Sequence, residues 1–286
     1  MEDSLSLGRL ASISVSRAGL STVIEAVRVR EPSGPYRPFV ASIPHGSTMI
    51  PTRFASLLTV EPDRLWVDAF TPELYAFVGD FGAITVEATL SRFVADPNRD
   101  PDALLFAPFW EGIVASTNSD GEQIYAAEPP ESELVERVLL AHTAYHRALD
   151  DAVERLCRFH DSMLLLDLHS FGTALDADVI LGDGRGTTAS PAAVSMLETA
   201  LTDHGFSVVR NVRFSGGWTV RRFAANPRVD AIQVELNQRC YIDPEAVEAY
   251  RLPRPYDPER IRITATRLRL ALAQALTAYE ADELDQ

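Results

Sequence analysis

The chain has 286 residues, 46% of them hydrophobic, and its 26 Lys+Arg against 41 Asp+Glu give a formal net charge of −15. This is an ordinary globular composition, and the length allows one large domain or two. The excess of acid excludes general binding to nucleic acid or to an anionic membrane. All 26 basic residues are arginine, so a Schiff-base lysine and the lysine of a P-loop are excluded as well.

The cysteines and the first residues indicate a cytoplasmic protein. Cys157 and Cys240 fit no CxxC spacing, so we expect buried free thiols in a reducing compartment and neither disulfides nor a cysteine–zinc site. Glu2 and Asp3 are not followed by the apolar segment of a signal peptide, and no run approaches the ~18 apolar residues of a membrane span. We expect a monomer or a small homo-oligomer.

The beginning of the chain predicts an extension followed by the first core strand. Residues 1–37 are rich in Ser and Arg, with a possible edge strand at 23–29. Residues 39–43 predict a strand, and the motif PHGST follows it directly. His45 therefore stands in a Gly-containing turn at the end of a strand, where its ring can project into a crevice.

The next segments contain an acid and two arginines of interest. Residues 62–78 have apolar side chains near helical spacing and predict a helix, with Asp68 toward its start. Residues 82–88 predict a strand that leads into SRFVADPNRD, a turn containing Arg92 and Arg99. Arginine is the residue type that binds a carboxylate with two parallel hydrogen bonds.

A long connection and a long helix follow. Residues 101–130 contain turn signals, and connections of this length are usually functional lids or disordered. Residues 131–160 predict an amphipathic helix that includes the pair His142 and His146. This HxxxH pair lacks the Glu of the HExxH protease signature. We interpret His142 as a surface residue, and His146 as part of the helix packing or as support behind a site.

The apolar stretch MLLLDLHSFG, residues 163–172, predicts a strand buried on both faces at the centre of an α/β sheet. Asp167 and His169 are two residues apart and point to the same side of that strand. Ligands of such sheets bind beyond the carboxyl ends of the strands. A buried carboxylate and imidazole require compensation, and either a metal ion or a plain Asp–His hydrogen bond could provide it.

The last segments complete an α/β pattern without an internal repeat or a linker, which favours a single domain. Glu235 lies near the end of the final predicted strand, and a carboxylate on a buried strand is rarely tolerated without a partner. We therefore favour a functional role for Glu235. The elements predicted here are strands at 177–182, 206–212 and 231–236, helices at 191–204 and 257–279, and a short helix after the FSGGW turn at 214–218.

The candidate residues suggest a metal-assisted hydrolysis. His45, His169, Glu235 and an acid such as Asp68 all lie near predicted loops and strand ends. Two imidazoles and one carboxylate are the ligand set of a catalytic zinc, which keeps a position open for water and lowers its pKa toward ~7. An unligated carboxylate can move the proton to a leaving amine. No GxSxG motif is present and no cysteine adjoins a histidine, so covalent acyl transfer has no obvious nucleophile.

A series of ordered motifs resembles the N-formylglutamate amidohydrolase (N-formylglutamate deformylase) family. It comprises PHGST, VDAF…LY, SRFVADPNRD, GIVAST…DGEQIY, YHRAL, LLLDLHSFG, FSGGWTVRRF and IQVELNQRCYID, from about residue 38 to 245. The resemblance implies kinship with zinc carboxypeptidase-like hydrolases. It also implies a three-layer α/β/α single domain with a mixed, mostly parallel sheet and a core at about 38–280. The implied reaction converts N-formyl-L-glutamate to formate and glutamate in histidine breakdown.

The resemblance also assigns roles to individual residues. His45 and His169 correspond to zinc ligands, and Asp68 occupies the family's acidic position, with Glu87 and Asp167 as substitutes for it. Glu235 corresponds to the general base. The residues implied to contact the substrate are Arg92 near the carbonyl oxygen, Asn98 and Arg99 at the substrate carboxylate, and Gly216, Gly217 and His146.

Two departures from the family pattern and two alternative functions complete the prediction. The chain has His-Gly-Ser where His-Ser-Gly is more usual, and Pro97 where Leu is usual, which can reshape the carboxylate pocket. A carboxypeptidase-like or deacylase-like reaction on another amide would require a more open cleft. A binding protein of the same fold would have no physical reason to place a base beside a metal.

Overall fold

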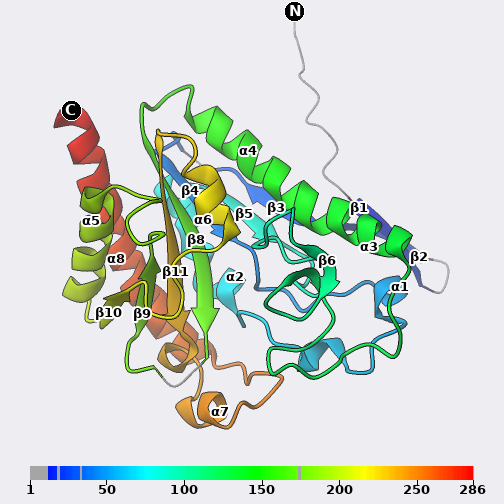
Figure 1. The fold of residues 1–286 in the computed structure, drawn as a ribbon. Coiled ribbons are helices and arrows are strands. Elements are labelled where there is room, and N and C mark those ends of the chain that lie inside the picture. Colours follow the sequence, from blue (N-terminus) through cyan, green and yellow to red (C-terminus); the bar gives the residue numbers. More distant parts are fainter. Residues whose placement is uncertain (1–11, 18–19, 33, 173–174, 286) are drawn as a thin grey trace, which may run out of the picture.

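A seven-stranded mixed sheet forms the middle layer of the protein, shown in Figure 1 as a computed structural model that describes residues 12–17, 20–32, 34–172 and 175–285. Four neighbouring strands in the middle of this sheet run parallel, the third strand from one edge is antiparallel to the second, and the strand at the other edge is antiparallel to its neighbour. The two outermost strands at the first edge are parallel to each other. In spatial order the strands are β10 (Val208–Arg210), β9 (Val179–Gly182), β11 (Val229–Asn237), β8 (Met163–Phe171), β4 (Phe39–Ile43), β5 (Ile84–Ala88) and β3 (Val27–Arg30).

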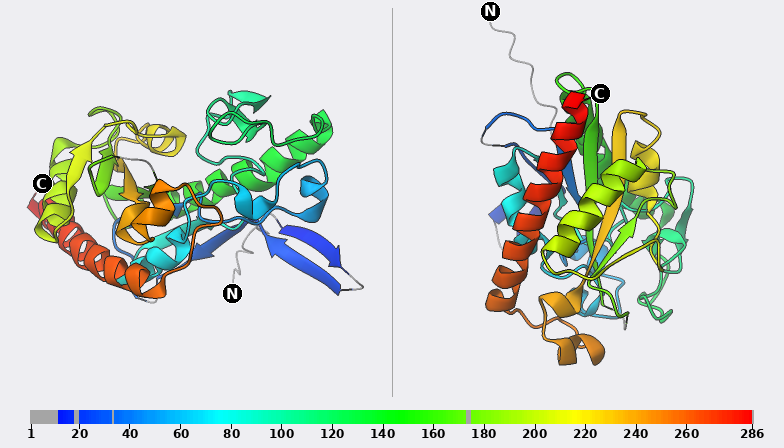
Figure 2. Two further views of the ribbon diagram at one scale, coloured as in Figure 1. Left: turned by 90° about the horizontal axis from the view of Figure 1, so that it is seen from below. Right: turned by 90° about the vertical axis from the view of Figure 1, so that its left-hand side faces the viewer.

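Helices cover both faces of this sheet (Figures 1 and 2). The α-helices are α1 (Thr52–Ala55), α2 (Thr71–Leu74), α3 (Glu131–Arg137), α4 (Ala144–Leu156), α5 (Pro191–Asp203), α6 (Trp218–Phe223), α7 (Pro244–Glu248) and α8 (Pro258–Asp285). A π-helical turn, η3 (Val138–Thr143), joins α3 to α4 as one continuous rod, which covers one face together with α6. The opposite face is covered by α5 and α8.

The central strand β8 divides the core into two halves. Leu164, Leu166 and Leu168 belong to the cluster packed against α5 and α8, whereas Met163 and Leu165 belong to the cluster on the α4 side. This alternation follows from the two-residue period of a strand, and burial on both faces explains the continuous apolar run. The predicted three-layer α/β/α fold and its buried central strand are confirmed.

The predicted helix at 62–78 is wrong. The segment forms separate short turns, η1 (Pro62–Arg64), α2 and η2 (Ala76–Phe81), with irregular backbone around Asp68. Phe70 has a φ of 63°, which a right-handed helix cannot contain. In a continuous helix the ring of Pro72 would also clash with the carbonyl of Asp68. That carbonyl instead accepts a hydrogen bond from the Thr71 hydroxyl at 3.0 Å, so Asp68 lies in a loop and not in a helix.

The long connection at 101–130 is ordered and contains its own two-stranded parallel sheet, β6 (Leu104–Ala107) and β7 (Gly112–Ala115). The fully buried Arg137 of α3 anchors the connection. Its guanidinium donates to the Tyr125 hydroxyl and to the Phe54 carbonyl, both at 2.8 Å. The connection is therefore held firmly enough to form one wall of a cavity.

The possible edge strand at 23–29 is divided between β2 (Leu20–Glu25) and β3, which belong to different sheets, and the remaining element predictions hold with shifted ends. The sheet edge is β3, preceded by the hairpin of β1 (Ser12–Arg17) and β2, which projects from the body of the protein (Figure 2). The predicted helix at 131–160 is present and includes the π turn, and α8 continues beyond the predicted end at 279.

The structure also bears on the two cysteines and on the expected absence of a membrane span. Cys157 and Cys240 are free thiols, but both are half-buried, so the expectation of full burial was wrong. Across the described part of the chain, no helix has both the length and the apolar character needed to traverse a bilayer.

Candidate metal centre and active site

The parallel strands β4, β8 and β11 end at one large cavity of about 530 Å³. Cavities of this size and place are typical of small-molecule sites in α/β sheets. The polar lining residues are His45, Asp68, Arg92, Asn98, Arg99, Ser119, Asp120, His169, Ser170, Arg213, Ser215, Gln233 and Glu235, and the others include Trp66, Phe109, Trp110, Gly216, Gly217 and Tyr250.

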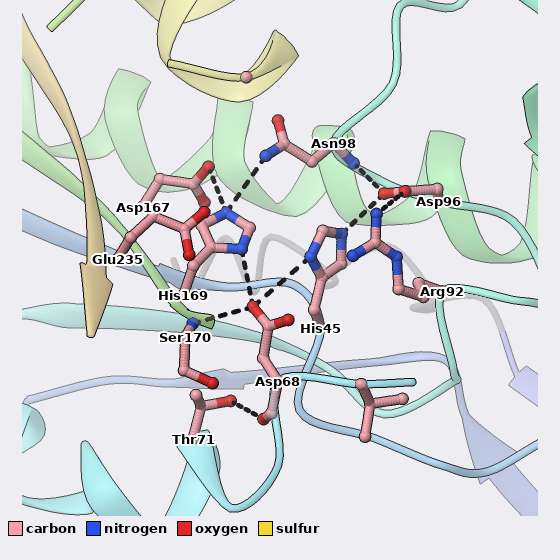
Figure 3. Close-up of polar contacts among 12 residues, drawn as sticks. His45, Asp68, Thr71, Arg92, Asp96, Asn98, Asp167, His169, Ser170 and Glu235 are labelled. Carbon is pink, nitrogen blue, oxygen red and sulfur yellow. Dashed lines mark hydrogen bonds and ion pairs between the residues drawn. The ribbon is translucent and has the colours of Figure 1, made fainter. Parts of the chain in front are cut away.

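The buried carboxylate of Asp68 lies at the centre of the polar end of this cavity (Figure 3). Its Oδ2 lies 2.9 Å from Nδ1 of His169 and 3.7 Å from Nδ1 of His45, and it accepts the Ser170 backbone N–H at 3.1 Å. The backbone N–H of Asp68 donates to the His45 carbonyl at 3.1 Å. The potential ligand atoms of the three side chains all lie within 4.8 Å of one another.

The far nitrogens of both imidazoles face other carboxylates. His45 Nε2 is 2.7 Å from Asp96 Oδ1, and His169 Nε2 is 2.9 Å from Asp167 Oδ2. Because an ionised carboxylate only accepts hydrogen bonds, each Nε2 carries a proton, and a neutral imidazole then directs an Nδ1 lone pair toward Asp68. Ligands of metal ions are commonly oriented by carboxylates in this way.

Three acceptors that converge in a buried site require a proton or a cation between them. Burial opposes the charged form of His169, yet Asp167 and Asp68 hold the pKa of that imidazole well above its usual value. Burial also raises the pKa of Asp68, but the hydrogen bond with His169 and the nearby His45 imidazole outweigh it and lower that pKa. His45 Nδ1 is buried without a hydrogen-bond partner among the described residues. Two imidazoles and one carboxylate fit a divalent metal ion, which would replace the shared proton.

Neither substitute for Asp68 is placed as well. Glu87 does not line the cavity, and its two oxygens lie 2.7 Å from Arg28 and Arg30. Asp167 contacts the Nε2 side of His169, while its Oδ1 accepts from the Ser42 hydroxyl at 2.5 Å. Asp68 alone of the three carboxylates faces both Nδ1 atoms.

Glu235 lines the same cavity from strand β11 without belonging to the cluster of potential metal ligands. Its neighbour in register on β8 is His169. Gln233 Nε2 donates to Glu235 Oε1 at 2.6 Å. Burial raises the pKa of Glu235 to about 7, with His169 opposing the shift and Asp68 adding to it. A carboxyl group with this pKa can both accept and release a proton near neutral pH.

The loop at 91–100 brings positive charge into an acidic protein. Arg92 donates to Asp96 Oδ2, and Arg99 NH1 lies 3.5 Å from the same oxygen. Burial raises the pKa of Asp96, but Arg92, Arg99 and His45 outweigh it and hold that pKa well below its usual range. Arg99 also donates to the carbonyls of Asn98 and Phe109. Both arginines line the cavity, and the Nε of each has no hydrogen-bond partner among the described residues.

The two glycines of the FSGGW motif allow the loop and helix α6 to approach each other. A Cβ on Gly217 would lie 2.3 Å from the Asn98 side-chain amide, and Gly216 has a φ of +113°. The Asn98 Oδ1 accepts the Thr219 backbone N–H at 3.0 Å. Both glycines line the cavity as backbone, beside Asn98 and Gln233.

For the two histidines of the long helix, the structure differs from the prediction at His142 and agrees with a packing or supporting place for His146. His142 is only 4% exposed, so its interpretation as a surface residue was wrong. His146 is buried too but does not line the cavity, so the structure gives it no direct contact with a substrate there. Instead, the ring of His146 contacts the Pro97 carbonyl behind the loop.

Several residues of the site were missed by sequence reasoning. Asp96 lies inside the quoted motif SRFVADPNRD, and its charge between two arginines was an available signal. Gln233 lies two residues before Glu235 on the same face of β11, and the alternation of a strand could have identified it. The aromatic wall from Trp66, Trp110 and Tyr250 depends on segments that meet only in the folded chain.

We expect the purified protein to hold one divalent metal ion per chain, and His169→Ala and Asp68→Asn to lose most of it. A ligand at 100 times its Kd stabilises a fold by about 2.7 kcal/mol. Chelation should therefore lower the Tm of the wild type and leave that of the variants nearly unchanged. Elemental analysis and thermal unfolding measure the metal content and the Tm. The control is His204→Ala, at a half-buried histidine outside the cavity, which should keep its metal. Full metal content in both site variants contradicts the assignment.

Comparisons with known proteins agree on one family. Residues 37–242 match the family model described as N-formylglutamate amidohydrolase. N-formylglutamate deformylase from Pseudomonas aeruginosa is 32% identical over 227 residues, and that from Pseudomonas putida is 30% identical over 230 residues. Each alignment covers 75% of this chain and 85% of the relative. The crystal structure of N-formylglutamate amidohydrolase from Ralstonia eutropha JMP134 superposes with a TM-score of 0.77 and 26% identity, covering 90% of this chain and 100% of that chain. The chain therefore belongs to the N-formylglutamate amidohydrolase family.

Proposed function

We propose that the protein is a zinc-dependent amidohydrolase that hydrolyses N-formyl-L-glutamate, or a closely similar N-acyl acidic amino acid, to formate and the free amino acid. The observation that carries the proposal is the convergence of His45, Asp68 and His169 beside the unligated Glu235. The activity for which the two Pseudomonas relatives are named agrees with it. We further propose that it acts in the cytoplasm, within histidine breakdown.

In this proposal each residue of the metal centre has a separate task. Nδ1 of His45, Nδ1 of His169 and the carboxylate of Asp68 would hold the metal. A divalent zinc ion bound there supplies Lewis-acid activation of water and of the amide carbonyl. Asp96 and Asp167 keep the two imidazoles in the tautomer that leaves Nδ1 free.

Glu235 would move the proton that the reaction requires. Water adds to the formyl carbon while the Glu235 carboxylate accepts one of its protons. The C–N bond then breaks, and the same carboxyl group returns the proton to the amine nitrogen, so the amine and formic acid are formed, and the acid releases its remaining proton to give formate. A pKa raised to about 7 by burial suits this exchange.

The arginines would hold the anionic substrate. Arg99, with Asn98, would bind the α-carboxylate, and Arg92 would stabilise negative charge on the attacked carbonyl oxygen. Arg213 also lines the cavity, is exposed and forms no ion pair with another described residue. It is therefore available to the second carboxylate of an acidic side chain.

A second candidate is a deacylase-like or carboxypeptidase-like reaction on a larger amide. The cavity volume of about 530 Å³ and the aromatic residues Trp66, Trp110 and Tyr250 at its wall favour this alternative. A panel of N-formyl, N-acetyl and N-benzoyl glutamates would separate the two, since a formyl-specific enzyme loses activity steeply as the acyl group grows.

Glu235→Gln should lower kcat by roughly 10²–10⁴-fold, the usual worth of a positioned general base. The amide keeps the size of the side chain but cannot accept a proton, so metal content should stay near that of the wild type. Formate release and elemental analysis on the same preparation measure both quantities. Loss of metal together with activity would make Glu235 a ligand, and full activity with metal bound would leave the mechanism without a base.

Arg99→Lys should raise the KM for N-formyl-L-glutamate although it conserves charge, because an ammonium cannot form two parallel hydrogen bonds to a carboxylate. The expected rise is roughly 10-fold, equivalent to about 1.4 kcal/mol. Arg185→Lys, at an exposed arginine in a different loop, serves as the control. An unchanged KM in Arg99→Lys contradicts the assignment of the carboxylate site.

A further inference from the structure

Two buried histidines contact the loop at 91–100 on the side that faces away from the cavity. His142 Nε2 lies 2.9 Å from the Arg99 carbonyl oxygen, and His146 Nε2 lies 2.8 Å from the Pro97 carbonyl oxygen. The rings are 4.7 Å apart and come from successive turns of the rod formed by η3 and α4. Their exposed fractions are 4% and 6%, and neither lines the cavity.

The hydrogen bonds have only one possible direction. A carbonyl oxygen accepts but cannot donate, so each Nε2 must carry the proton. No other described residue donates a hydrogen bond to the carbonyl of Pro97 or of Arg99. A buried carbonyl left without a donor costs about 1–3 kcal/mol, so the two histidines satisfy groups that the irregular loop cannot satisfy itself.

The two carbonyls lie on either side of Asn98. The backbone N–H of Asn98 donates to Asp96 Oδ1 at 2.9 Å, and its side-chain oxygen accepts from Thr219 at 3.0 Å. The peptide group before Asn98 and the peptide group after Arg99 are thus fixed from the helix side, while the Asn98 side chain is fixed from the cavity side. Arg99 follows Asn98 in the chain. Its guanidinium lies beside Asp96, and the residue lines the cavity.

We propose that His142 and His146 form a positioning clamp that sets the affinity for the substrate carboxylate through Asn98 and Arg99, without contacting the substrate. The proposal rests on the proposed function of those two residues. Burial, with a smaller contribution from the neighbouring His142, lowers the pKa of His146 to about 4, and burial lowers the pKa of His142. The clamp therefore consists of two neutral N–H donors that add no charge behind the arginines. The π-helical turn that carries His142 is of a kind found frequently at functional sites.

The test compares Gln and Asn at each histidine. The Gln amide nitrogen reaches about as far as the imidazole Nε2, whereas the Asn amide falls short of it, so the two substitutions differ in reach and little in polarity. His142→Asn and His146→Asn should each raise the KM for N-formyl-L-glutamate by roughly 3–10-fold, the usual net worth of one hydrogen bond. The corresponding Gln variants should restore most of the affinity, and kcat per bound metal should change by less than about 3-fold in all four.

A matched control and a double variant separate positioning from general damage. His160 forms the same kind of bond, from Nε2 to the Tyr36 carbonyl at 3.2 Å, but it precedes β8 at the opposite end of the sheet. His160→Asn should leave KM unchanged. The effects of His142→Asn and Arg99→Lys should combine to less than their product, because both act on one contact.

The outcomes distinguish this proposal from the function on which it rests. A wild-type protein that hydrolyses no N-formyl amino acid overturns both. Normal wild-type turnover with equal KM values for the Asn and Gln variants overturns the clamp alone. A loss confined to kcat, or an Asn variant of His160 that raises KM as much, also overturns it. If an Asn variant does not fold, the Gln variant still decides, since a KM like that of the wild type supports a donor role and a 10-fold rise contradicts it.

Discussion

The buried carboxylate of Asp68, held between two imidazole nitrogens, is the interaction on which the rest of the site depends. Nδ1 of His45 and of His169 face it at 3.7 and 2.9 Å. Two more carboxylates lie on the far sides of these rings, Asp96 beside His45 and Asp167 beside His169. So much buried negative charge is unfavourable unless a positive charge lies among the groups. In the chain alone, His169 and the arginines of the loop supply it, and a divalent cation would supply more of it at the point where the three ligand atoms converge.

The fold places these groups together at low cost to stability. Strands β4, β8 and β11 are parallel, so their carboxyl ends meet at one edge of the sheet. Apolar clusters on both faces of the sheet carry the stability of the domain. The polar residues of the site lie between the middle and the carboxyl ends of strands β8 and β11 and in the loops beside these ends. The loop with Asn98 and Arg99 has no regular structure of its own, and the rod formed by η3 and α4 supports it through His142 and His146.

Much of this arrangement could be predicted from the sequence, and the exceptions have physical causes. The burial of β8 and the shared side of Asp167 and His169 follow from the apolar run and the two-residue period of a strand. The resemblance to the family predicted Asp68 as a metal ligand. The helix predicted around Asp68 was wrong, because apolar spacing does not reveal the left-handed φ of Phe70. His142 was misjudged because its burial depends on a hydrogen bond to the Arg99 carbonyl of an irregular loop. Such a contact between segments 43 residues apart depends on the folded chain.

The most direct measurement is formate release from N-formyl-L-glutamate by the chelator-treated protein, before and after zinc is returned. If the Asp68 centre is the catalytic metal site, the treated protein should be nearly inactive while still folded. Zinc should then restore release of formate and glutamate in equal amounts. Undiminished release by protein shown to be free of metal would contradict a metal-dependent mechanism. A fully remetallated protein that releases no formate would contradict the proposed substrate.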